Sequence, residues 1–285
     1  MKPQTQTWLV LGAGGMLGTD MVAVARERGH DVVAANREHT DVADPHALAA
    51  AVTGVDVVVN CSAYTAVDEA EAHEADAHLL NAVAPELIAR ACVGAGSRLV
   101  HVSTDYVFAG DATEPYAENS ERAPISAYGR TKAEGERRVE ASGADALIVR
   151  TAWLYGEHGA SFPKTIARIS REHEEISVVD DQHGQPTWTM DLADLIVRLV
   201  DADAPAGIYH GTSSGETTWF GFAQEVVNEI GANTRVLSTD SNAYKRPAPR
   251  PAWSVLDHAA LGRTGVKPIG DWRQRWLVAA QAIKF

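Results

Sequence analysis

The sequence of 285 residues contains only two cysteines, Cys61 and Cys92, and neither lies in a C-x-x-C pair or at a metal-ligand spacing. A disulfide framework and a cysteine-based metal site are therefore excluded, and we expect both thiols to be reduced packing residues. No apolar run approaches the roughly 20 residues of a membrane helix, and the start M-K-P-Q-T-Q-T lacks the apolar stretch of a targeting peptide. These absences predict a cytoplasmic protein.

Basic residues are also scarce, because 25 Lys and Arg stand against 38 Asp and Glu and leave a net charge of -13. Nucleic acid and anionic membranes both need a basic footprint on the protein, so this balance argues against nonspecific affinity for either. Low-complexity tracts and internal repeats are not visible, and 45% hydrophobic with 22% charged residues is typical of a folded globular protein. A small anionic ligand needs only a local basic cluster.

Short, valine-rich apolar runs recur through the first 150 residues, each with the composition of a strand that is buried on both faces. Longer helix-compatible stretches separate them. This alternation predicts an α/β fold with a Rossmann-type, doubly wound parallel sheet and right-handed crossovers. The runs begin at Trp8, Asp31, Asp56, Arg98 and Ala146.

The pattern changes beyond Thr151, where a smaller substrate-binding lobe is expected. Residues 1–150 should form the NAD(P)-binding domain and residues 151–285 mainly this lobe. Helices are predicted over 161–171 and 218–230, and the run K-R-P-A-P-R-P is loop-like.

Two strand-like runs in the second half, beginning at Ile176 and Gly207, are expected to return to the sheet. Segments around 176–210 would then rejoin the first domain, so the boundary would not be a single cut.

A glycine-rich turn follows the first predicted strand, with Gly12, Gly15 and Gly18 at the spacing G-x-x-G-x-x-G as a helix begins. Glycines here allow a tight turn, a close backbone approach to a diphosphate, and close packing of helix on strand. A glycine turn can be merely structural, but its place inside a β-α-β pattern favours dinucleotide binding.

The end of the second predicted strand carries Asn36 and Arg37 where an acidic residue would bind a ribose 2′-hydroxyl. An arginine can meet a 2′-phosphate, which favours NADPH and leaves NADH open. Asp41 and Val42 begin a second loop that could contact adenine, although Asp41 could equally cap the helix near Asp44.

The segment S-A-Y-G-R-T-K sets Tyr128 and Lys132 four residues apart. Pro124 and Ser126 suit a helix start, so the phenol and the ammonium fall on one helical face. A tyrosine with an ordinary pKa of about 10 needs a nearby cation to act as an acid-base at neutral pH. The alternative is a half-buried tyrosine beside a solvated lysine, and the surrounding motifs favour catalysis.

Polar residues also follow the fourth predicted strand, in V-S-T-D-Y-V-F, at an edge where open α/β sheets bind ligands. The Thr104 hydroxyl could bond a substrate carbonyl and tune the tyrosine. Alternatively, Ser103, Thr104 and Asp105 satisfy backbone groups in a turn.

With these motifs the chain resembles the extended short-chain dehydrogenase/reductases and, among them, the dTDP-4-dehydrorhamnose reductases. The likeness extends over essentially the whole chain. Its motifs are G-x-x-G-x-x-G at Gly12, N-C-S-A-Y-T-A-V-D-x-A-E from Asn60, S-T-D-Y-V-F from Ser103, Y-G-R-T-K from Tyr128, R-T-A-W-L-Y-G from Arg150, D-D-Q-x-G-x-P-T from Asp180 and G-x-T-T-W from Gly215.

The resemblance implies hydride transfer from NADPH to the C4 ketone of dTDP-4-dehydro-6-deoxy-L-mannose, giving dTDP-L-rhamnose. By this likeness Tyr128 protonates the developing alkoxide, Lys132 lowers the pKa of that tyrosine, and Thr104 tunes it. Asp105 and Trp153 would contact the sugar. The residues predicted to contact the cofactor are Gly12, Gly15, Met16, Leu17, Gly18, Asn36, Arg37, Asp41, Val42, Ala63, Tyr64, Thr65, Tyr128 and Lys132.

Basic residues of the proline-rich segment, Lys245, Arg246 and Arg250, form a local cluster on this acidic protein. They could reach the substrate diphosphate, and Arg250 is the predicted contact, or they could be solvated loop charges.

Some members of the family resembled are dimers bridged by Mg²⁺ through glutamates, but the matching positions here are Asp20 and Met190. A methionine cannot replace a hard oxygen ligand, so we expect no metal site and a monomer or a homodimer without such a bridge. Val102 stands where a tyrosine can occur in that family, which removes one cofactor contact.

Three other functions are compatible with the same likeness. A nucleotide-sugar dehydratase typically has glutamate at the place of Tyr106, so elimination is disfavoured. A 4-epimerase would retain tightly bound NAD⁺. A non-catalytic subunit resembling the regulatory β subunit of methionine adenosyltransferase can keep the tyrosine and the lysine.

Overall fold

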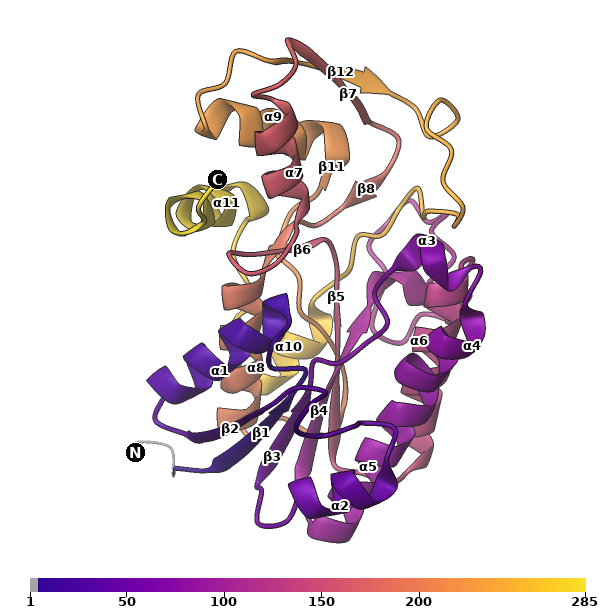
Figure 1. Ribbon diagram of the computed structural model, residues 1–285, viewed down its shortest axis with the longest axis vertical. Coiled ribbons are helices and arrows are strands. Elements are labelled where there is room, and N and C mark those ends of the chain that lie inside the picture. The colour runs from indigo at the N-terminus through magenta and orange to yellow at the C-terminus, as the bar shows by residue number, and fades with distance from the viewer. Residues whose placement is uncertain (1–4) are drawn as a thin grey trace.

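The computed structural model describes residues 5–285 (Figure 1), so the first four residues of the segment expected to lack a targeting peptide lie outside it. A six-stranded parallel sheet has the strand order β10-β5-β4-β3-β1-β2. Its strands are β1 (Thr7–Leu11), β2 (Asp31–Ala35), β3 (Val57–Asn60), β4 (Arg98–Thr104), β5 (Ala146–Thr151) and β10 (Gly207–His210). The five strands predicted in the first 150 residues are confirmed, and so is the fold class.

Burial explains why these runs form the centre of the sheet. Every residue of β5 is buried, and so is every residue of β3, as expected for strands covered on both faces. The chain order reverses at β1, which pairs with β2 on one side and β3 on the other. The carboxyl ends of β1 and β3 therefore flank the topological switch point, where open α/β sheets bind ligands.

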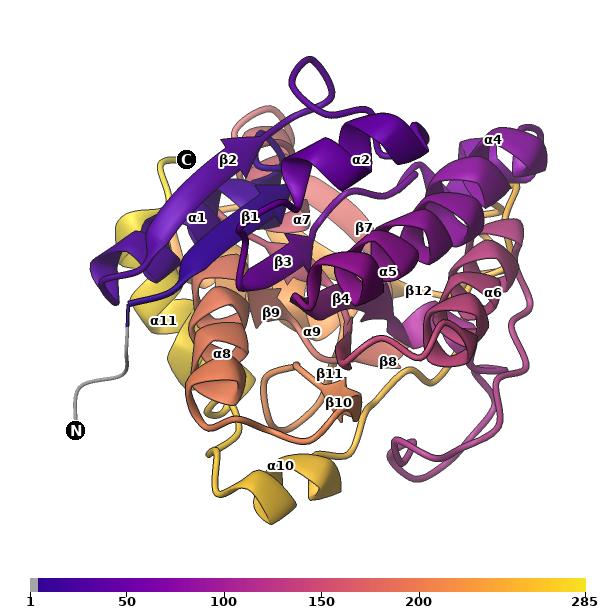
Figure 2. The same cartoon turned by 90° about the horizontal axis from the view of Figure 1, so that it is seen from below.

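Helices cover both faces of the sheet (Figure 2). One face carries α1 (Met16–Glu27), α8 (Thr189–Asp201) and α10 (Ala259–Thr264), and the other carries α2 (Pro45–Ala51), α5 (Ala84–Ala95) and α6 (Ala127–Ala141). Short elements lie near the carboxyl ends of the strands: α3 (Val67–Ala70), α4 (Glu74–His78), the π-helical turn η1 (Leu79–Val83) and the 3₁₀ turn η2 (Asp105–Val107). No helix within residues 5–285 is both long and apolar enough to cross a membrane.

A second lobe stands above the carboxyl edge of the sheet in Figure 1. Its core is aromatic, with Tyr155, Phe222 and Trp276 packed together. The lobe contains α7 (Phe162–Ile169), α9 (Trp219–Glu229) and α11 (Trp272–Ala282), with strand pairs β7 (Glu175–Val179) with β12 (Arg235–Thr239), β6 (Leu154–Tyr155) with β9 (Thr187–Trp188), and β8 (His183–Gly184) with β11 (Thr217–Thr218). The helices predicted over 161–171 and 218–230 are confirmed as α7 and α9.

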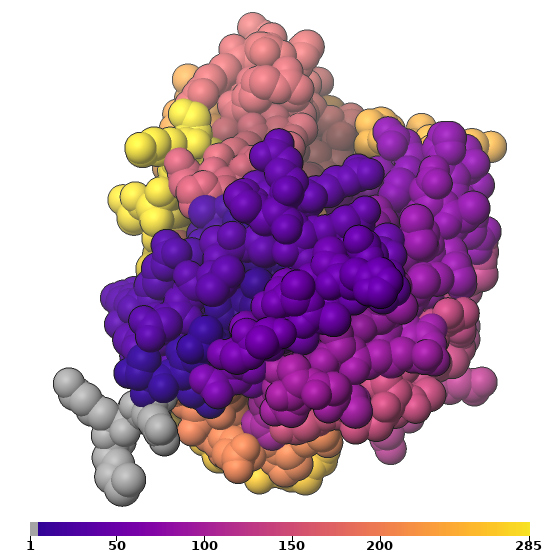
Figure 3. All heavy atoms as spheres, turned by 60° about the horizontal axis from the view of Figure 1, so that its bottom comes forward, coloured from indigo at the N-terminus to yellow at the C-terminus, as the bar shows by residue number. Residues whose placement is uncertain are grey.

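The chain returns to the sheet after entering the second lobe, because α8 packs on α1 and β10 pairs with β5. Figure 3 shows orange and yellow atoms of the last third of the chain both above and below the indigo and purple surface. The expectation that the run at Ile176 also rejoins the sheet was wrong, because β7 pairs with β12 instead. Only Ile176 and Val178 of β7 are fully buried, the alternation of a strand with one face in contact with a core.

Candidate active site

A cavity of about 1030 Å³ lies between the carboxyl edge of the sheet and the second lobe. All of the predicted cofactor and substrate contacts except Arg250 line it. The predicted residues at its wall are Gly12, Gly15, Met16, Leu17, Gly18, Asn36, Arg37, Asp41, Val42, Ala63, Tyr64, Thr65, Thr104, Asp105, Tyr128, Lys132 and Trp153.

The glycine turn between β1 and α1 leaves no room for a side chain at Gly12 or at Gly18. Gly12 has φ +75°, and a Cβ there would stand 2.8 Å from the backbone nitrogen of Ser62. A Cβ on Gly18 would lie 2.1 Å from the carbonyl oxygen of Gly12. Gly15 is the N-cap of the 12-residue helix α1 and has no side-chain cap, so the turn presents bare backbone at the positive end of a helix. This arrangement fits a diphosphate.

Two aspartates in the loop after β2 precede the next helix, and Asp44 is the one that caps it. The Asp44 carboxylate accepts a hydrogen bond from the backbone N–H of His46, and Pro45 follows in the first turn of α2. Asp41 instead accepts from the N–H of Ala43 and lines the cavity. Arg37 is exposed at the cavity wall, where a guanidinium suits a 2′-phosphate.

Helix α6 brings the phenol and the ammonium into the cavity. The Ser126 hydroxyl caps it by accepting a hydrogen bond from the N–H of Gly129 at 3.1 Å. A Cβ on Gly129 would lie 2.2 Å from the carbonyl oxygen of Tyr106, so glycine lets the first turn of α6 approach η2 closely. Tyr128 consequently stands beside the end of β4, and Lys132 lies on the same helical face with 2% exposure.

Burial dominates the titration of this pair. It raises the pKa of Tyr128 to about 12, against an opposing effect of Thr104 and with a further increase from Asp105. Burial also lowers the pKa of Lys132 to about 8, which Glu136 and Cys61 oppose. The Lys132 ammonium donates to the backbone carbonyl of Val102 at 2.7 Å, and its predicted lowering of the phenol pKa stays a prediction. The phenol is protonated at neutral pH, as a proton donor must be.

Two hydroxyl-binding groups open into the cavity near the phenol. The Thr104 hydroxyl donates to Asp105 Oδ1 at 2.8 Å, and burial raises the pKa of Asp105 to about 6 although Thr104 and Ser254 lower it. Asp105 Oδ2 and Thr151 Oγ1 are buried and have no hydrogen-bond partner within residues 5–285. Because buried polar atoms are nearly always paired, both are suited to a polyhydroxylated ligand.

A buried charge network lies behind this wall and was not anticipated from the sequence. The Glu136 carboxylate accepts hydrogen bonds from Ser103 at 2.5 Å and from Arg150 at 2.9 and 2.7 Å. Burial alone would raise the pKa of Glu136, but Arg150, Ser103 and Arg122 hold it at about 2. Because Ser103 precedes Thr104 in β4, the network holds the strand end that carries the Thr104 hydroxyl. The sign of this network in the sequence is that Glu136 follows Lys132 by four residues, which places both on one face of the helix.

Asn81 is a second residue that the sequence did not single out. It lies in the π-helical turn η1, and its side chain accepts from the N–H of Tyr64 at 2.8 Å and donates to the carbonyl of Tyr64 at 3.1 Å. It also donates to Thr131 of α6 at 3.1 Å. Asn81 thus ties the loop after β3 to the catalytic helix, and π turns recur at functional sites.

The predicted substrate contact Arg250 lies outside the wall of this cavity. Arg250 does not line the cavity within residues 5–285, because its guanidinium pairs with the carboxylate of Asp68. Arg246 contacts the same carboxylate at 3.6 Å, and the hydrogen bond from Arg250 is the main cause that lowers the pKa of Asp68. The two guanidinium groups therefore share an intramolecular carboxylate, and the contact of Arg250 with the substrate diphosphate stays a prediction.

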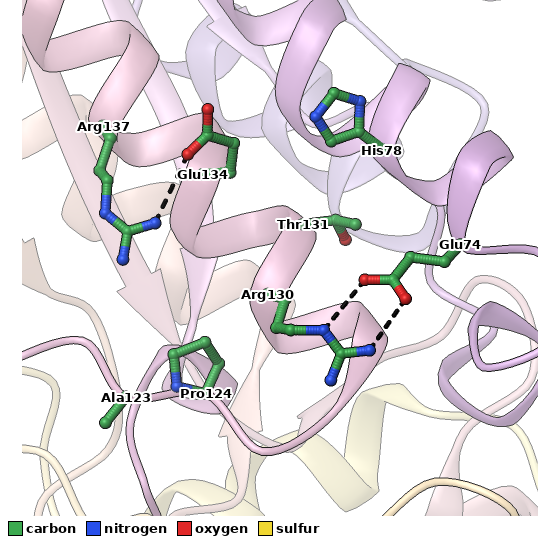
Figure 4. A pocket seen from close by; sticks show the side chains of 8 residues that line it. All are labelled: Glu74, His78, Ala123, Pro124, Arg130, Thr131, Glu134 and Arg137. Carbon is green, nitrogen blue, oxygen red and sulfur yellow. Dashed lines mark hydrogen bonds and ion pairs between the residues drawn. The ribbon is translucent and has the colours of Figure 1, made fainter.

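A smaller hollow of about 620 Å³ lies on the outer side of α4 and α6 (Figure 4). Its charged walls are paired, since Arg130 forms two hydrogen bonds with Glu74 and Arg137 contacts Glu134. Within residues 5–285 no cluster of three or more His, Cys, Asp or Glu side chains is placed to hold a metal ion. The larger cavity, which contains Tyr128 and Lys132, is therefore the candidate active site.

A doubly wound sheet, a bare glycine turn at its switch point, and a tyrosine and lysine four apart define an extended short-chain dehydrogenase/reductase. A family model described as RmlD substrate binding domain matches residues 6–283. The chain belongs to this RmlD family.

Two curated relatives and one solved structure illustrate the family. A Streptomyces antibioticus protein named "Probable dTDP-4,6-dihydroxy-2-methyloxan-3-one 4-ketoreductase" is 49% identical over 93% of this chain and 92% of its own length. A Streptomyces griseus dTDP-4-dehydrorhamnose reductase is 46% identical over 93% of this chain and 90% of its own. The crystal structure of the Bacillus anthracis dTDP-4-dehydrorhamnose reductase in complex with NADP has a TM-score of 0.93 and 32% identity, over 98% of this chain and 99% of that one.

Proposed function

We propose that this protein reduces the C4 ketone of dTDP-4-dehydro-6-deoxy-L-mannose with NADPH and forms dTDP-L-rhamnose. The observation that carries the proposal is the convergence of Tyr128, Thr104 and Asp105 in one cavity with the glycine turn of Gly12. The S. griseus and B. anthracis relatives, both named dTDP-4-dehydrorhamnose reductase, support the choice of substrate.

The residues suited to hold NADPH fall into three groups along the cavity. The backbone of Gly15 to Leu17 would cradle the diphosphate, and Arg37 would meet the 2′-phosphate. Lys132 would bind the nicotinamide ribose. The bound nicotinamide supplies the hydride. The B. anthracis relative, crystallised with NADP, supports this cofactor choice.

The side chains around the ketone have distinct tasks in this proposal. The Thr104 hydroxyl, which donates to Asp105 Oδ1 in this structure, would turn to donate to the carbonyl oxygen. Tyr128, protonated at neutral pH, would deliver its proton to that oxygen as negative charge develops. Asp105 accepts a sugar hydroxyl through its unpaired Oδ2. Trp153 borders the sugar at the cavity wall.

An assay of NADPH oxidation with authentic dTDP-4-dehydro-6-deoxy-L-mannose tests the activity. We expect substrate-dependent loss of reduced-cofactor absorbance in the wild type. Tyr128→Phe should fold and bind NADPH but lose turnover by at least about 100-fold. Tyr244→Phe is the matched control, because Tyr244 is 58% exposed. Folded wild-type protein that leaves the cofactor unoxidised would refute the reductase assignment and favour the non-catalytic subunit.

A different dTDP-ketosugar is the second candidate substrate, since the S. antibioticus relative carries the name of another 4-ketoreductase. The same assay with dTDP-4,6-dihydroxy-2-methyloxan-3-one, the ketosugar in the name of that relative, distinguishes the two, and the sugar with the larger kcat/KM is the substrate. Release of the cofactor after each turnover excludes a 4-epimerase, which retains it.

We propose further that the protein works in the cytoplasm, as a monomer or homodimer without a Mg²⁺ bridge. Asp20 accepts a hydrogen bond from Thr189 at 2.5 Å, and Met190 packs against the core. Met190 has no oxygen to offer Mg²⁺, so the two positions do not supply a pair of hard ligands. The elution volume in size-exclusion chromatography should not change when EDTA replaces Mg²⁺. We keep residues 1–150 as the proposed cofactor-binding domain, rejoined by α8 and β10.

A further inference from the structure

The backbone of Trp153 adopts an unfavourable conformation at the cavity wall. Its φ is +47°, and within residues 5–285 Asp203 is the one other non-glycine residue with a positive φ. A bulky side chain in this region is strained, and such strain persists only where the surroundings impose it. The contacts of the Trp153 indole are therefore informative.

Trp219 covers one face of that indole. The two rings stack with centroids 3.6 Å apart and an interplanar angle of 8°. Trp219 is the first residue of α9. The ring of Phe162 in α7 packs against it, with ring centroids 4.5 Å apart. The indole that covers Trp153 is thus anchored in the core of the second lobe.

The backbone of Gly184 also lies against the Trp153 indole. A Cβ at Gly184 would stand 2.4, 2.6 and 2.7 Å from Cε2, Cζ2 and Nε1 of Trp153, three contiguous ring atoms. Any larger residue at this position would displace the ring. Gly184 itself does not line the cavity within residues 5–285, so its contact with the cavity passes through Trp153.

Gly184 and Trp219 come from two sequence motifs, D-D-Q-H-G-Q-P-T and G-E-T-T-W, to which the proposed mechanism gives no role. The β8–β11 ribbon joins these motifs by pairing Thr217 with Gly184. The Thr218 hydroxyl donates a hydrogen bond to the Asp180 carboxylate at 2.6 Å. This bond joins the two motifs a second time.

We propose that Gly184 and Trp219 hold the Trp153 indole and set its place at the sugar end of the cavity, with Gly184 as a positioning residue and Trp219 as a positioning residue that also lines the cavity. The inference rests on the proposed function in one respect, that Trp153 borders the substrate. It gives the two motifs a shared task. Specificity among ketosugars would then depend on the β8–β11 ribbon, which does not touch the sugar itself.

Circular dichroism gives a readout that is independent of turnover. Two indoles stacked in van der Waals contact couple their strong far-ultraviolet transitions, and we expect an exciton couplet in the free wild-type protein from a rotation of one ring relative to the other about the stacking axis. Trp219→Phe and Trp219→Ala should both lose the couplet, and Gly184→Ala should change its amplitude. Trp253→Phe is the control, since it removes an indole that contacts His183 on the same ribbon at 5.5 Å, and it should keep the couplet.

Kinetics with NADPH and dTDP-4-dehydro-6-deoxy-L-mannose then test positioning. Gly184→Ala and Trp219→Ala should raise the KM for the sugar roughly two- to tenfold with a smaller effect on kcat. Trp219→Phe should restore a KM near that of the wild type because a benzene ring still covers Trp153. The dissociation constant for NADPH should be unchanged in all variants.

Several results would overturn the proposal. An unchanged couplet and an unchanged KM in Gly184→Ala would do so, and so would an unchanged KM in Trp219→Ala. If Gly184→Ala does not fold, the comparison of Trp219→Ala with Trp219→Phe decides, and equal KM values refute positioning. Failure of the proposed function is distinct, because a wild type that leaves the ketosugar unreduced still reports on the indole stack through its couplet.

Discussion

Replacing Glu136 with glutamine tests whether the buried charge network fixes the catalytic strand. The Glu136 side chain is 0% exposed and that of Arg150 is 1% exposed. The substitution keeps the shape but removes the negative charge, and the amide nitrogen of glutamine cannot accept from a guanidinium. Arg150 would then remain buried without a full counter-charge.

The expected cost follows from this geometry. Breaking a buried ion pair by removing one partner typically costs about 3–5 kcal/mol, because the remaining charge stays desolvated. Glu140→Gln is a matched control one turn further along α6, since Glu140 also pairs with Arg122 but its side chain is 43% exposed. An exposed pair of this kind contributes at most about 1 kcal/mol.

Urea unfolding at neutral pH measures both variants. We expect Glu136→Gln to lower the midpoint strongly at an unchanged slope, and Glu140→Gln to leave it nearly unchanged. The difference should also depend on pH. The pKa of Glu136 is about 2 in the folded protein against an ordinary value of 4.5, so its contribution is fully present above pH 4.5 and is lost as the pH falls towards 2. Equal stability of the two variants at neutral pH would refute the reasoning.

Two further predictions concern the cavity. Asp105, with a folded pKa of about 6 against an ordinary value of 3.8, binds its proton more tightly in the folded state. Wild-type stability should therefore fall relative to Asp105→Asn as the pH rises from about 4 to above 6, by up to roughly 3 kcal/mol in urea unfolding, and parallel curves would contradict the burial of this charge. Gly18→Ala should weaken NADPH binding by at least about tenfold in a fluorescence titration, because its Cβ would lie 2.1 Å from the Gly12 carbonyl oxygen. Gly14→Ala, with nothing within 4 Å of its Cβ, should bind normally, and equal affinities would contradict the steric argument.

The sheet and the glycine turn could be predicted because their signals are local. Each central strand is a short apolar run, and the glycines and the Tyr128–Lys132 pair lie at fixed spacings within one turn or helix. The run at Ile176 was misassigned because its composition resembles that of the sheet strands. Its alternating burial against the second lobe is the property that distinguishes it.

The supports of the site could not be predicted from spacing. Arg150 meets Glu136 across 14 residues of chain, Asn81 meets Tyr64 across 17, and Trp219 meets Trp153 from another lobe segment much further along the chain. Such pairings depend on how the helices pack on the sheet, and the spacing of residues in a single sequence does not specify that packing. The burial that raises the pKa of Tyr128 likewise depends on this packing and is not visible in the motif.

The return of β10 to the sheet has a consequence for synthesis on the ribosome. Strand β5 ends at Thr151, but its neighbour β10 begins only at Gly207, about 55 residues later. At ~5–20 residues per second, the exposed edge of β5 waits roughly 3–11 s for its partner. During that interval the nascent chain presents one unpaired edge of an apolar strand. Such an edge is a template for wrong pairing. Newly made protein should therefore depend on chaperones more than refolding of the complete chain does.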